Sequence, residues 1–476
     1  MTDDSNRCFN PQADPFWLTM ISPSPDEGRI TLIILDQVRT QIVFTDLFMP
    51  ERDGVELMVE LRKSAPKLEI LTISGDGRGS LSHCGDRVLD GRTGMRQRRG
   101  MNCFRMRLPR FVPVGVFAVV GVFASPGVAE EAPAPVPKNI SMHFIPAANS
   151  HFSYEGRFDF SAADGPVVIW EGSRIGLDFQ GPALALRFAD IKDQVFFNAQ
   201  VDGGTPQIIQ VPAGKSARIE LPVPPAGEWH QLRLFKRTEA TAGHATFSGA
   251  EIAPVASVRA PAQEKYKLRM EFFGDSIMVG ACNEDGATDQ WEDHRTHNNA
   301  LSYTALTAMA FRADYRCIAV SGMGIATGYV EVKAGEVWNR IYPIAGSKLA
   351  DLSAWLPDVA IINFGENDDA FTRTQHQPFP AGYTEGYIEL VRAMRQAYPT
   401  THFVLLRGGM YGGAQSEPLR LAWEAVVKTV EAGDPAISHY VFTHWSSTHP
   451  RVVDDRELAE ELTAWLKQQP FMRRYL

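Results

Sequence analysis

The sequence predicts two structural classes in succession, a small β-jelly-roll domain at residues 139–258 and an α/β domain at residues 266–476. Two observations support this prediction. The first segment contains many short strands, which Gly, Pro and Asp separate from one another. In the second segment apolar strands alternate five times with amphipathic helices, a pattern typical of a five-stranded, doubly wound parallel sheet.

The composition is that of an ordinary globular protein. The 476 residues suffice for two or three domains, with 44% hydrophobic and 22% charged residues. The net charge of −9 gives no indication of a nucleic-acid partner. No run of eighteen apolar residues occurs, so no strong transmembrane helix is predicted. The five cysteines match no zinc-binding spacing.

The first hundred residues contain a fragment of a recognisable pattern. Within Gln41–Gly75, Asp46 ends an apolar strand, and Met49–Pro50 and Asp53–Gly54 follow it. These features resemble the phosphoacceptor aspartate and the adjoining turn of a bacterial response-regulator receiver domain. The acidic pair and the lysine that such a domain also needs are not evident, so Asp46 is expected to be non-functional. Arg78–Gly100 is rich in Arg and Gly and is predicted to be loop or disordered.

A secretory signal pattern occupies residues 101–129. A basic segment at Met106–Arg110 precedes a fourteen-residue apolar run (FVPVGVFAVVGVFA) and a stretch of small residues. A proline-rich linker follows at residues 130–138. Since an export signal must lie at an N-terminus, translation is expected to start at Met101 or Met106, and the product to be periplasmic or secreted. The alternative is an internal anchor helix within a longer chain.

The individual elements are predicted from periodicity and from turn residues. The strands expected in the jelly-roll domain are Val167–Trp170, Arg174–Phe179, Ala183–Phe188, Phe196–Val201 and Gln231–Phe235. The strands expected in the α/β domain are Leu268–Phe273, Arg316–Val320, Val359–Phe364, His402–Leu406 and His439–Thr443. The helices expected there are Ala300–Phe311, Leu349–Leu356, Tyr383–Ala397, Glu417–Ala432 and Asp455–Gln468.

Polar or glycine-containing turns follow four of these parallel strands. They carry Ser276, Gly322, Asn367 and His449, and the carboxyl ends of parallel strands meet in one crevice. Ser276 is the expected nucleophile and His449 the general base and acid. The N–H groups of Ser276 and Gly322 and the amide of Asn367 are expected to form an oxyanion hole. Each residue alone is commonplace, but their joint occurrence in this order favours acyl transfer.

This set resembles the SGNH (GDSL-type) hydrolases, a family named after Ser, Gly, Asn and His in four sequence blocks. The resemblance covers residues 268–468 and is closest to carbohydrate esterase family 2, in which a small jelly roll precedes the hydrolase domain. Further stretches similar to that family are Lys236–Ala240, His297–Tyr303, Ser321–Gly324 and Leu406–Met410. The resemblance implies an acetylesterase that acts on polysaccharides such as xylan or glucomannan through an acyl-enzyme, without a cofactor.

One position departs from the family pattern. Most SGNH enzymes carry an aspartate three residues before the histidine, where this chain has Ser446. Either the site is therefore a Ser–His dyad, in which the family allows a backbone carbonyl of Trp445–Ser447 to orient the histidine, or another group takes the place of the aspartate. The carboxylates nearest in sequence are Asp368, Asp369, Asp454 and Asp455. The last two are expected to cap the final helix.

Several other signals have a plain structural interpretation beside a functional one. Gly322–Gly328 has the spacing GxGxxxG, which does not match the dinucleotide-binding GxGxxG. The segment Glu292–His297 has residues able to bind a metal, but a solvated loop is expected. Asp275 is expected to bond backbone groups around the serine turn. Arg237 and Glu239 are expected to join the two domains.

Three aromatic residues near the expected site are candidates for stacking on sugar: Trp291, Tyr329 and Trp445. Packing roles for them are equally open. Cys282 and Cys317 are either a disulfide or two buried thiols, because the sequence does not give their separation.

The residues also leave other functions open. One is an SGNH esterase that acts on a different acyl ester, such as a lipase, a thioesterase, an arylesterase or a peptidoglycan deacetylase. Another is a carbohydrate-binding protein without activity, whose support is Ser446 in place of the usual aspartate. The expected partner is an acetylated polysaccharide or oligosaccharide, without nucleic acid and without stable membrane insertion.

Overall fold

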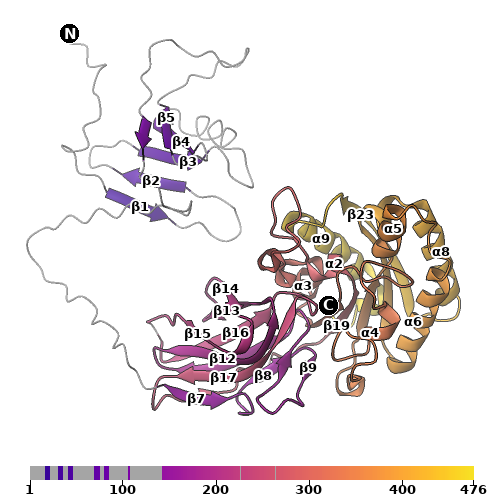
Figure 1. Ribbon diagram of the computed structural model, residues 1–476, viewed down its shortest axis with the longest axis horizontal. Coiled ribbons are helices and arrows are strands. Elements are labelled where there is room, and N and C mark those ends of the chain that lie inside the picture. The colour runs from indigo at the N-terminus through magenta and orange to yellow at the C-terminus, as the bar shows by residue number, and fades with distance from the viewer. Residues whose placement is uncertain are drawn as a thin grey trace, which may run out of the picture. The chain divides into compact units, whose positions relative to one another are not determined.

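The computed structural model describes residues 142–476, apart from residues 226 and 263, and six short strands nearer the N-terminus (Figure 1). Its contacts divide the chain into two units, Met1–Ala132 and Pro133–Leu476. No helix among the described residues has the length and apolar character needed to cross a bilayer.

The first unit contains one sheet with the order β1-β2-β3-β4-β5-β6. Its strands are Trp17–Ile21, Thr31–Leu35, Gln41–Asp46, Glu69–Gly75, Ser80–Cys84 and Arg105–Arg107. Strand β3, which ends at Asp46, pairs in parallel with β4, and the other pairs are antiparallel. The segment between β3 and β4 lies outside the described residues, as do the predicted signal peptide, apart from β6, and the linker. The receiver resemblance and the export signal therefore stay predictions.

The second unit begins with an antiparallel β-sandwich. One sheet has the order β15-β12-β17-β10-β9, with β7 also paired to β17, and contains Gly214–Leu221, Leu184–Asp193, Gly243–Ile252, Val167–Val168, Phe158–Asp159 and His143–Pro146. The other has the order β14-β13-β16-β11-β18, with β8 also paired to β11, and contains Gln207–Val211, Val195–Val201, Trp229–Lys236, Arg174–Gln180, Val258–Arg259 and Ser153–Glu155. The predicted sandwich-type domain is confirmed.

The core of the sandwich forms because alternate residues of its strands point inward. In β16, His230, Leu232, Leu234 and Lys236 are buried, while the residues between them are at least partly exposed. Aromatic side chains from both sheets meet in the core: the rings of Phe188 on β12 and Phe197 on β13 stack with centroids 5.5 Å apart.

The α/β domain has a five-stranded sheet with the order β20-β19-β21-β22-β23, in which every pair is parallel. The strands are Asp314–Ala319, Arg269–Gly274, Val359–Asn363, His402–Met410 and Ile437–Ser446. The predicted doubly wound sheet is thus confirmed. The residues of β21 are all buried, as expected for a strand covered by helices on both faces.

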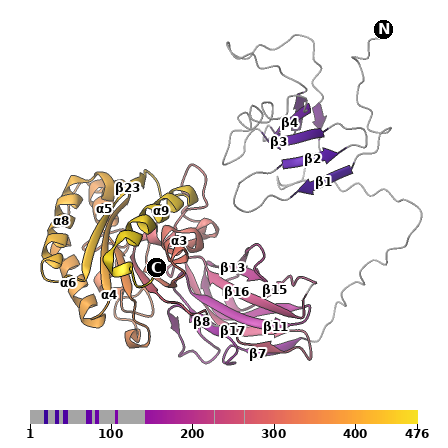
Figure 2. The ribbon, with the colours of Figure 1, turned by 180° about the vertical axis from the view of Figure 1, so that it is seen from behind.

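Helices cover both faces of this sheet (Figures 1 and 2). They are α2 Ser276–Val279, α3 Tyr303–Ala310, α4 Ala334–Val337, α5 Glu366–Thr374, α6 Tyr383–Ala397, α7 Tyr411–Gln415, α8 Glu417–Glu431 and α9 Val452–Gln468. Helices α4, α6 and α8 share one hydrophobic core with the sheet, and α2, α3 and α9 share another. The result is a three-layer α/β/α arrangement.

Two helix predictions need correction. Of the helix expected at Leu349–Leu356, only a 3₁₀ turn at Leu352–Ala354 forms, because the carboxylate of Asp351 accepts the N–H of Ser353 and so favours a local turn. The helix expected from Ala300 begins at Tyr303, where the Ser302 side chain caps it by accepting the N–H of Ala305.

Two smaller points concern an unpredicted helix and the cysteines. Helix α5 was not predicted, since its sequence ENDDAFTRT has little apolar periodicity. Cys282 and Cys317 are buried free thiols, so no disulfide joins them.

The sandwich covers one edge of the parallel sheet. Strand β20 lies at that edge, and its outward N–H and C=O groups bind side chains of the sandwich domain. The carboxylate of Glu171 accepts the N–H of Ala319 at 3.0 Å, and the Arg174 guanidinium donates to the carbonyl of Tyr315 at 3.2 Å. Just beyond the strand, Glu239 accepts the N–H of Ser321 at 2.8 Å. The two domains are therefore joined by directional bonds as well as by apolar packing.

A second link between the domains is a buried ion pair. The Arg157 guanidinium lies 3.0 Å from the carboxylate of Glu271 on β19, and it also donates to the carbonyls of Trp338 and Arg340. The Tyr398 hydroxyl donates to the other oxygen of Glu271 at 2.8 Å. Since both charged side chains are nearly inaccessible, each depends on the other for compensation.

Replacing Arg157 by Met should therefore lower the free energy of unfolding by about 3–5 kcal/mol, because the charge of Glu271 would remain buried without its partner. Urea unfolding followed by tryptophan fluorescence measures this. A suitable control is Arg259→Met, since the more exposed Arg259–Asp178 pair is expected to contribute about 0–1 kcal/mol. Equal losses in the two variants would contradict the prediction.

Candidate active site

Ser276 lies at the first residue of α2, directly after β19 and the Gly274–Asp275 turn. Asp275 caps this short helix: its carboxylate accepts the N–H of Ile277 at 3.2 Å. The helix ends after one turn at Gly280, whose φ of +76° is in the left-handed region that glycine adopts without strain. This tight strand–turn–helix connection holds the Ser276 hydroxyl at the carboxyl end of the sheet.

His449 lies in the loop between β23 and α9. It is far from Ser276 in the sequence but next to it in space. Its Nε2 is 3.0 Å from the Oγ of Ser276. This distance is within hydrogen-bond reach, as a base needs to accept the hydroxyl proton. The structure thus brings together the two residues that the sequence predicts as nucleophile and base.

The partner of His449 is Asp289, which the sequence did not identify. The Nδ1 of His449 is 2.7 Å from the Oδ2 of Asp289, and the other carboxylate oxygen is 2.8 Å from the Arg451 guanidinium. Of the two alternatives that the sequence left open, this contact favours another group, the Asp289 carboxylate, over a dyad whose histidine is oriented by a backbone carbonyl of Trp445–Ser447. Asp289 lies in an irregular loop far from His449 in sequence, so no spacing rule indicated it.

The surroundings of Asp289 strongly favour the ionised form of its carboxyl group. The hydrogen bond from His449 is the largest cause that lowers the pKa of this carboxyl, and the Arg451 guanidinium lowers it further, so that the pKa lies well below its usual range. Asp289 is thus ionised throughout the neutral pH range. An ionised carboxylate here can orient the imidazole and stabilise it when it takes up a proton.

The carboxylates considered from sequence have other partners. Asp454 accepts the N–H of Arg451 at the start of α9 and so caps that helix as expected. Asp455 does not: it is fully buried and accepts from the N–H of Tyr303 and the amide of Asn283. Its position one residue further along α9 turns it inward, towards α3.

The turn after β20 carries Gly322 beside the serine turn. Val320 donates its N–H to the carbonyl of Gly274 at 3.2 Å, so the two turns leave the sheet side by side. Gly322 has a φ of +78°, and its carbonyl accepts the N–H of Tyr329 at 2.8 Å. The glycine is needed here, because a side chain would be strained in this backbone conformation.

Asn367 lies in the first turn of α5, and its amide is held towards the serine turn. Its Nδ2 donates to the Oδ2 of Asp275 at 3.0 Å and to the carbonyl of Met323 at 3.2 Å. Asp275 is adjacent to Ser276 in the chain, so its carboxylate connects the serine and asparagine turns. Burial is the main cause that raises the pKa of Asp275 to about 8. Asp275 therefore has the structural role expected from sequence, with Asn367 as an additional partner.

The glycine-containing turn at residues 322–328 is occupied by a protein carboxylate. Asp368 accepts the N–H groups of Ile325, Ala326 and Thr327 at 2.8–3.0 Å. A phosphate would need such N–H groups to be free. The turn thus serves to position the Gly322 region.

The three candidate aromatic residues lie in different surroundings. Trp291 packs on the catalytic-site imidazole, with ring centroids of Trp291 and His449 5.2 Å apart, and 38% of its surface is exposed. Tyr329 is exposed and contacts Phe371, next to the Gly322 turn. Trp445 is half-buried and packs edge-on against Tyr411 at 6.1 Å. Trp291 is therefore the aromatic side chain placed directly at the Ser276–His449 pair.

Arg237 and Glu239 join the two domains, as expected. The Arg237 guanidinium, which is buried, bonds to the carboxylate of Glu284 and to the carbonyls of Arg295 and His297. These contacts hold the loop that carries Asp289 against the sandwich. The prediction of a solvated loop at Glu292–His297 is only partly correct, because His297 at the end of this loop is completely buried.

Comparison with known families agrees with this geometry. Residues 154–261 match the model described as carbohydrate esterase 2 N-terminal, and residues 272–463 match the GDSL-like lipase/acylhydrolase family. Residues 154–463 form a GDSL-type hydrolase of carbohydrate esterase family 2. The SGNH resemblance of the sequence is thereby confirmed for this part of the chain.

Two curated proteins are similar to this family 2 hydrolase. The cellulase/esterase CelE of Acetivibrio thermocellus is 30% identical over 67% of this chain. The matched region covers only 40% of the length of that relative. The acetylxylan esterase/glucomannan deacetylase of Cellvibrio japonicus is 28% identical over 65% of this chain and 88% of the relative. A solved family two carbohydrate esterase from Clostridium thermocellum, in complex with cellohexaose, is 28% identical with a TM-score of 0.59, covering 66% of this chain and 98% of that one.

Proposed function

We propose that the chain is a serine acetylesterase that removes acetyl groups from polysaccharide of the xylan or glucomannan type. The observation that carries this proposal is the continuous series of contacts from Ser276 through His449 to Asp289. The base is within hydrogen-bond reach of the nucleophile on one side and of the orienting carboxylate on the other, which is the arrangement that acyl transfer needs.

The proposed reaction has two halves. In the first, the Oγ of Ser276 attacks the acetyl carbonyl while the Nε2 of His449 takes the hydroxyl proton. The negative oxygen that forms is stabilised by the N–H groups of Ser276 and Gly322. The amide of Asn367 joins them once its Nδ2 turns away from the carboxyl of Asp275 or the carbonyl of Met323, to which it donates in this structure. The C–O bond to the sugar then breaks, and His449 returns its proton to the leaving sugar hydroxyl.

In the second half, a water molecule attacks the acetyl-serine ester. His449 accepts a proton from the water and then donates it to the Oγ of Ser276, which leaves as the hydroxyl. Acetic acid leaves and gives its proton to solvent to become acetate, and the enzyme returns to its starting state. Asp289 remains ionised through both halves and balances the positive charge of the imidazolium.

Carbohydrate is the proposed substrate class because of the relatives and of the exposed aromatic residues. Both curated relatives are named as esterases, one of them as an acetylxylan esterase and glucomannan deacetylase. Trp291 and Tyr329 expose ring surface beside the site, where a sugar face can stack, and Trp445 is a third candidate. The acetylated polysaccharide would be recognised through these rings while its acetyl group enters the crevice.

The two alternative functions are less well supported. A binding protein without activity was suggested by Ser446 in place of the usual aspartate, but Asp289 supplies a carboxylate to His449. A different acyl substrate remains an outcome of the experiment below. We also propose that the segment 101–129 directs export, so that the enzyme meets its glycan substrate in the periplasm or outside the cell. Within Gln41–Gly75 we propose a receiver remnant without function.

The test is a substrate panel for the full chain: 4-nitrophenyl acetate, butyrate and octanoate, with acetate release measured from acetylated xylan and acetylated glucomannan. We expect kcat/KM to fall by at least about tenfold from acetate to butyrate, because the two added methylene groups need room in the crevice that an acetyl group does not. Faster hydrolysis of octanoate than of acetate would instead indicate a lipase or thioesterase. Binding of the polysaccharide without release of acetate would favour the carbohydrate-binding alternative.

A further inference from the structure

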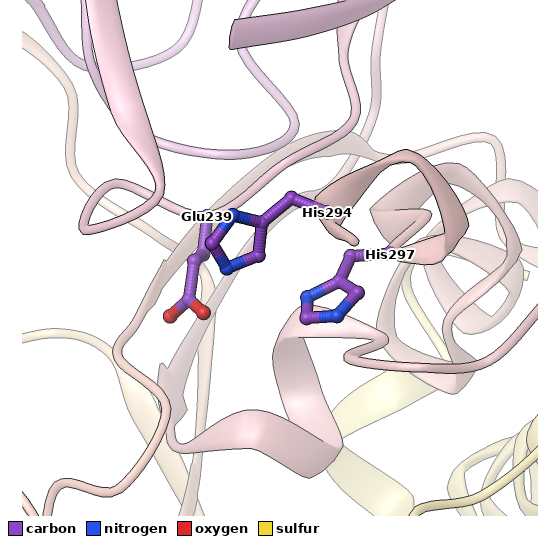
Figure 3. A group of neighbouring side chains, drawn as sticks. All are labelled: Glu239, His294 and His297. Carbon is purple, nitrogen blue, oxygen red and sulfur yellow. The ribbon is translucent and has the colours of Figure 1, made fainter. Parts of the chain in front are cut away.

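A cluster of three metal-binding side chains lies next to the active site and takes no part in the proposed reaction. Glu239, His294 and His297 each offer a ligand atom, and these atoms lie within 4.8 Å of one another. Figure 3 shows the three side chains turned towards a common space. Glu239 comes from the sandwich domain, between β16 and β17, and the histidines come from the loop that also carries Asp289.

The local structure explains why the two histidines converge. They are separated by three positions across the 3₁₀ turn His294–Thr296, and side chains at this spacing lie over one another in a 3₁₀ helix. Their ring centroids are 4.7 Å apart. The turn is capped by Asp293, which accepts the N–H of Arg295, so the histidines are held on a defined backbone.

The polar atoms of the cluster are not used by one another. His297 is completely buried, and its Nε2 contacts the Sγ of Cys282 at 3.4 Å, but its Nδ1 has no hydrogen-bond partner among the described residues. Neither histidine forms an ion pair with Glu239 in the described part of the chain. One oxygen of Glu239 accepts the N–H of Ser321, and the other remains available. A buried imidazole nitrogen without a partner costs free energy unless something binds it.

We propose that Glu239, His294 and His297 bind a divalent transition-metal ion, for which zinc is the best candidate. Two imidazoles and one carboxylate are a ligand set that zinc accepts, with a fourth position left for water. Around a tetrahedral zinc with bonds of about 2.0–2.1 Å, ligand atoms lie roughly 3.3 Å apart. Small side-chain rotations are therefore enough to close the present cluster around the ion.

The position of the site gives the metal a definite role. Its ligands come from both domains, and the histidine loop carries Asp289 and Trp291. A bound ion would tie this loop to the sandwich, alongside the contact of Arg237 with Glu284. Metal binding would thus stabilise the folded chain and hold the Asp289 loop, without any contact between the ion and Ser276.

A second cluster must be separated from this one. Cys282, Asp289 and His449 also have ligand atoms within 4.8 Å of one another, but two of them belong to the proposed catalytic triad. An ion bound there would remove Asp289 from His449 and inhibit the enzyme. The two clusters share no residue, so variants can distinguish them.

The experiment uses the full chain, stripped of metal by a chelator, and measures zinc binding by equilibrium dialysis together with the thermal unfolding midpoint. We expect one zinc ion per chain and a higher midpoint with zinc. His294→Ala and Glu239→Gln should weaken zinc binding by at least about tenfold and abolish the increase in midpoint. Glutamine at residue 239 keeps an oxygen for the N–H of Ser321, so this variant is expected to fold.

Two controls complete the design. His244→Ala removes a half-buried histidine that packs on Tyr342 and belongs to neither cluster, and it should bind zinc as the parent does. Asp289→Asn disrupts the second cluster alone and should also retain zinc binding. Zinc binding that is lost in Asp289→Asn but kept in His294→Ala would place the ion at the triad and overturn the proposal. Absence of stoichiometric binding by the folded parent would overturn it as well.

Discussion

Ser276→Ala is expected to reduce kcat for 4-nitrophenyl acetate by about 10⁴- to 10⁶-fold while leaving the thermal unfolding midpoint nearly unchanged. Without the Oγ, no acetyl-enzyme can form, and His449 loses the group that lies 3.0 Å from its Nε2. The remaining activity would come from the oxyanion donors and from substrate positioning alone. Steady-state hydrolysis measures the loss. Intact-mass spectrometry after brief mixing should show an acetylated parent and an unmodified variant.

The matched control for this serine is Ser446→Ala. Ser446 occupies the position at which most SGNH enzymes carry the catalytic aspartate, but in this structure its hydroxyl contacts only Thr448 among the described residues. We expect this variant to retain activity within about threefold of the parent. If Ser446→Ala were as inactive as Ser276→Ala, the assignment of Asp289 as the partner of His449 would be wrong.

Asp289→Asn is expected to reduce kcat by about 10³- to 10⁴-fold with little change in KM. Arg451 lies 2.8 Å from one carboxylate oxygen and will attract the carbonyl of the new amide. The amide NH₂ group then faces the Nδ1 of His449 and donates to it. This bond selects the imidazole tautomer with its proton on Nε2, which cannot accept the Ser276 proton.

Asp293→Asn is the matched control, because it makes the same chemical change in the same loop. Asp293 caps the 3₁₀ turn, and asparagine caps such turns about as well as aspartate does. If the parent and Asp293→Asn have comparable pH–rate profiles, the loss of activity in Asp289→Asn does not come merely from removing one negative charge from this loop. Nearly full activity of Asp289→Asn would instead support orientation of His449 by a backbone carbonyl.

The fold class could be predicted from sequence because its signals are local and repeated. Five buried apolar strands, such as Val359–Asn363, alternate with helices whose apolar faces recur at helical spacing. The helix expected at Leu349–Leu356 failed for a local reason, since Asp351 and Ser353 form a hydrogen bond that competes with helix. Helix α5 escaped prediction because its first turn is acidic and is buried by contacts with other loops.

The candidate site was predictable only where its residues follow strands. A parallel strand lies just before each of Ser276, Gly322, Asn367 and His449, so the topology alone brings these residues to the carboxyl end of the sheet. Asp289 lies in an irregular loop that is positioned by Arg237 and Arg451, which are long-range partners. Such contacts depend on the assembled tertiary structure, and no spacing in the sequence indicates them.

The covered edge of strand β20 has a consequence for how this enzyme can be cut and recombined. The outward groups of Tyr315, Ala319 and Ser321 are bound by side chains of the sandwich domain. A hydrolase domain separated from the sandwich would present these groups in a row, and an open strand edge is a template on which other chains can add. We therefore expect the sandwich to prevent this association, in addition to holding the loop that lies beside the active site. In engineered fusions, we expect that residues 142–476 must be transferred together, with the sandwich and the hydrolase domain in one piece.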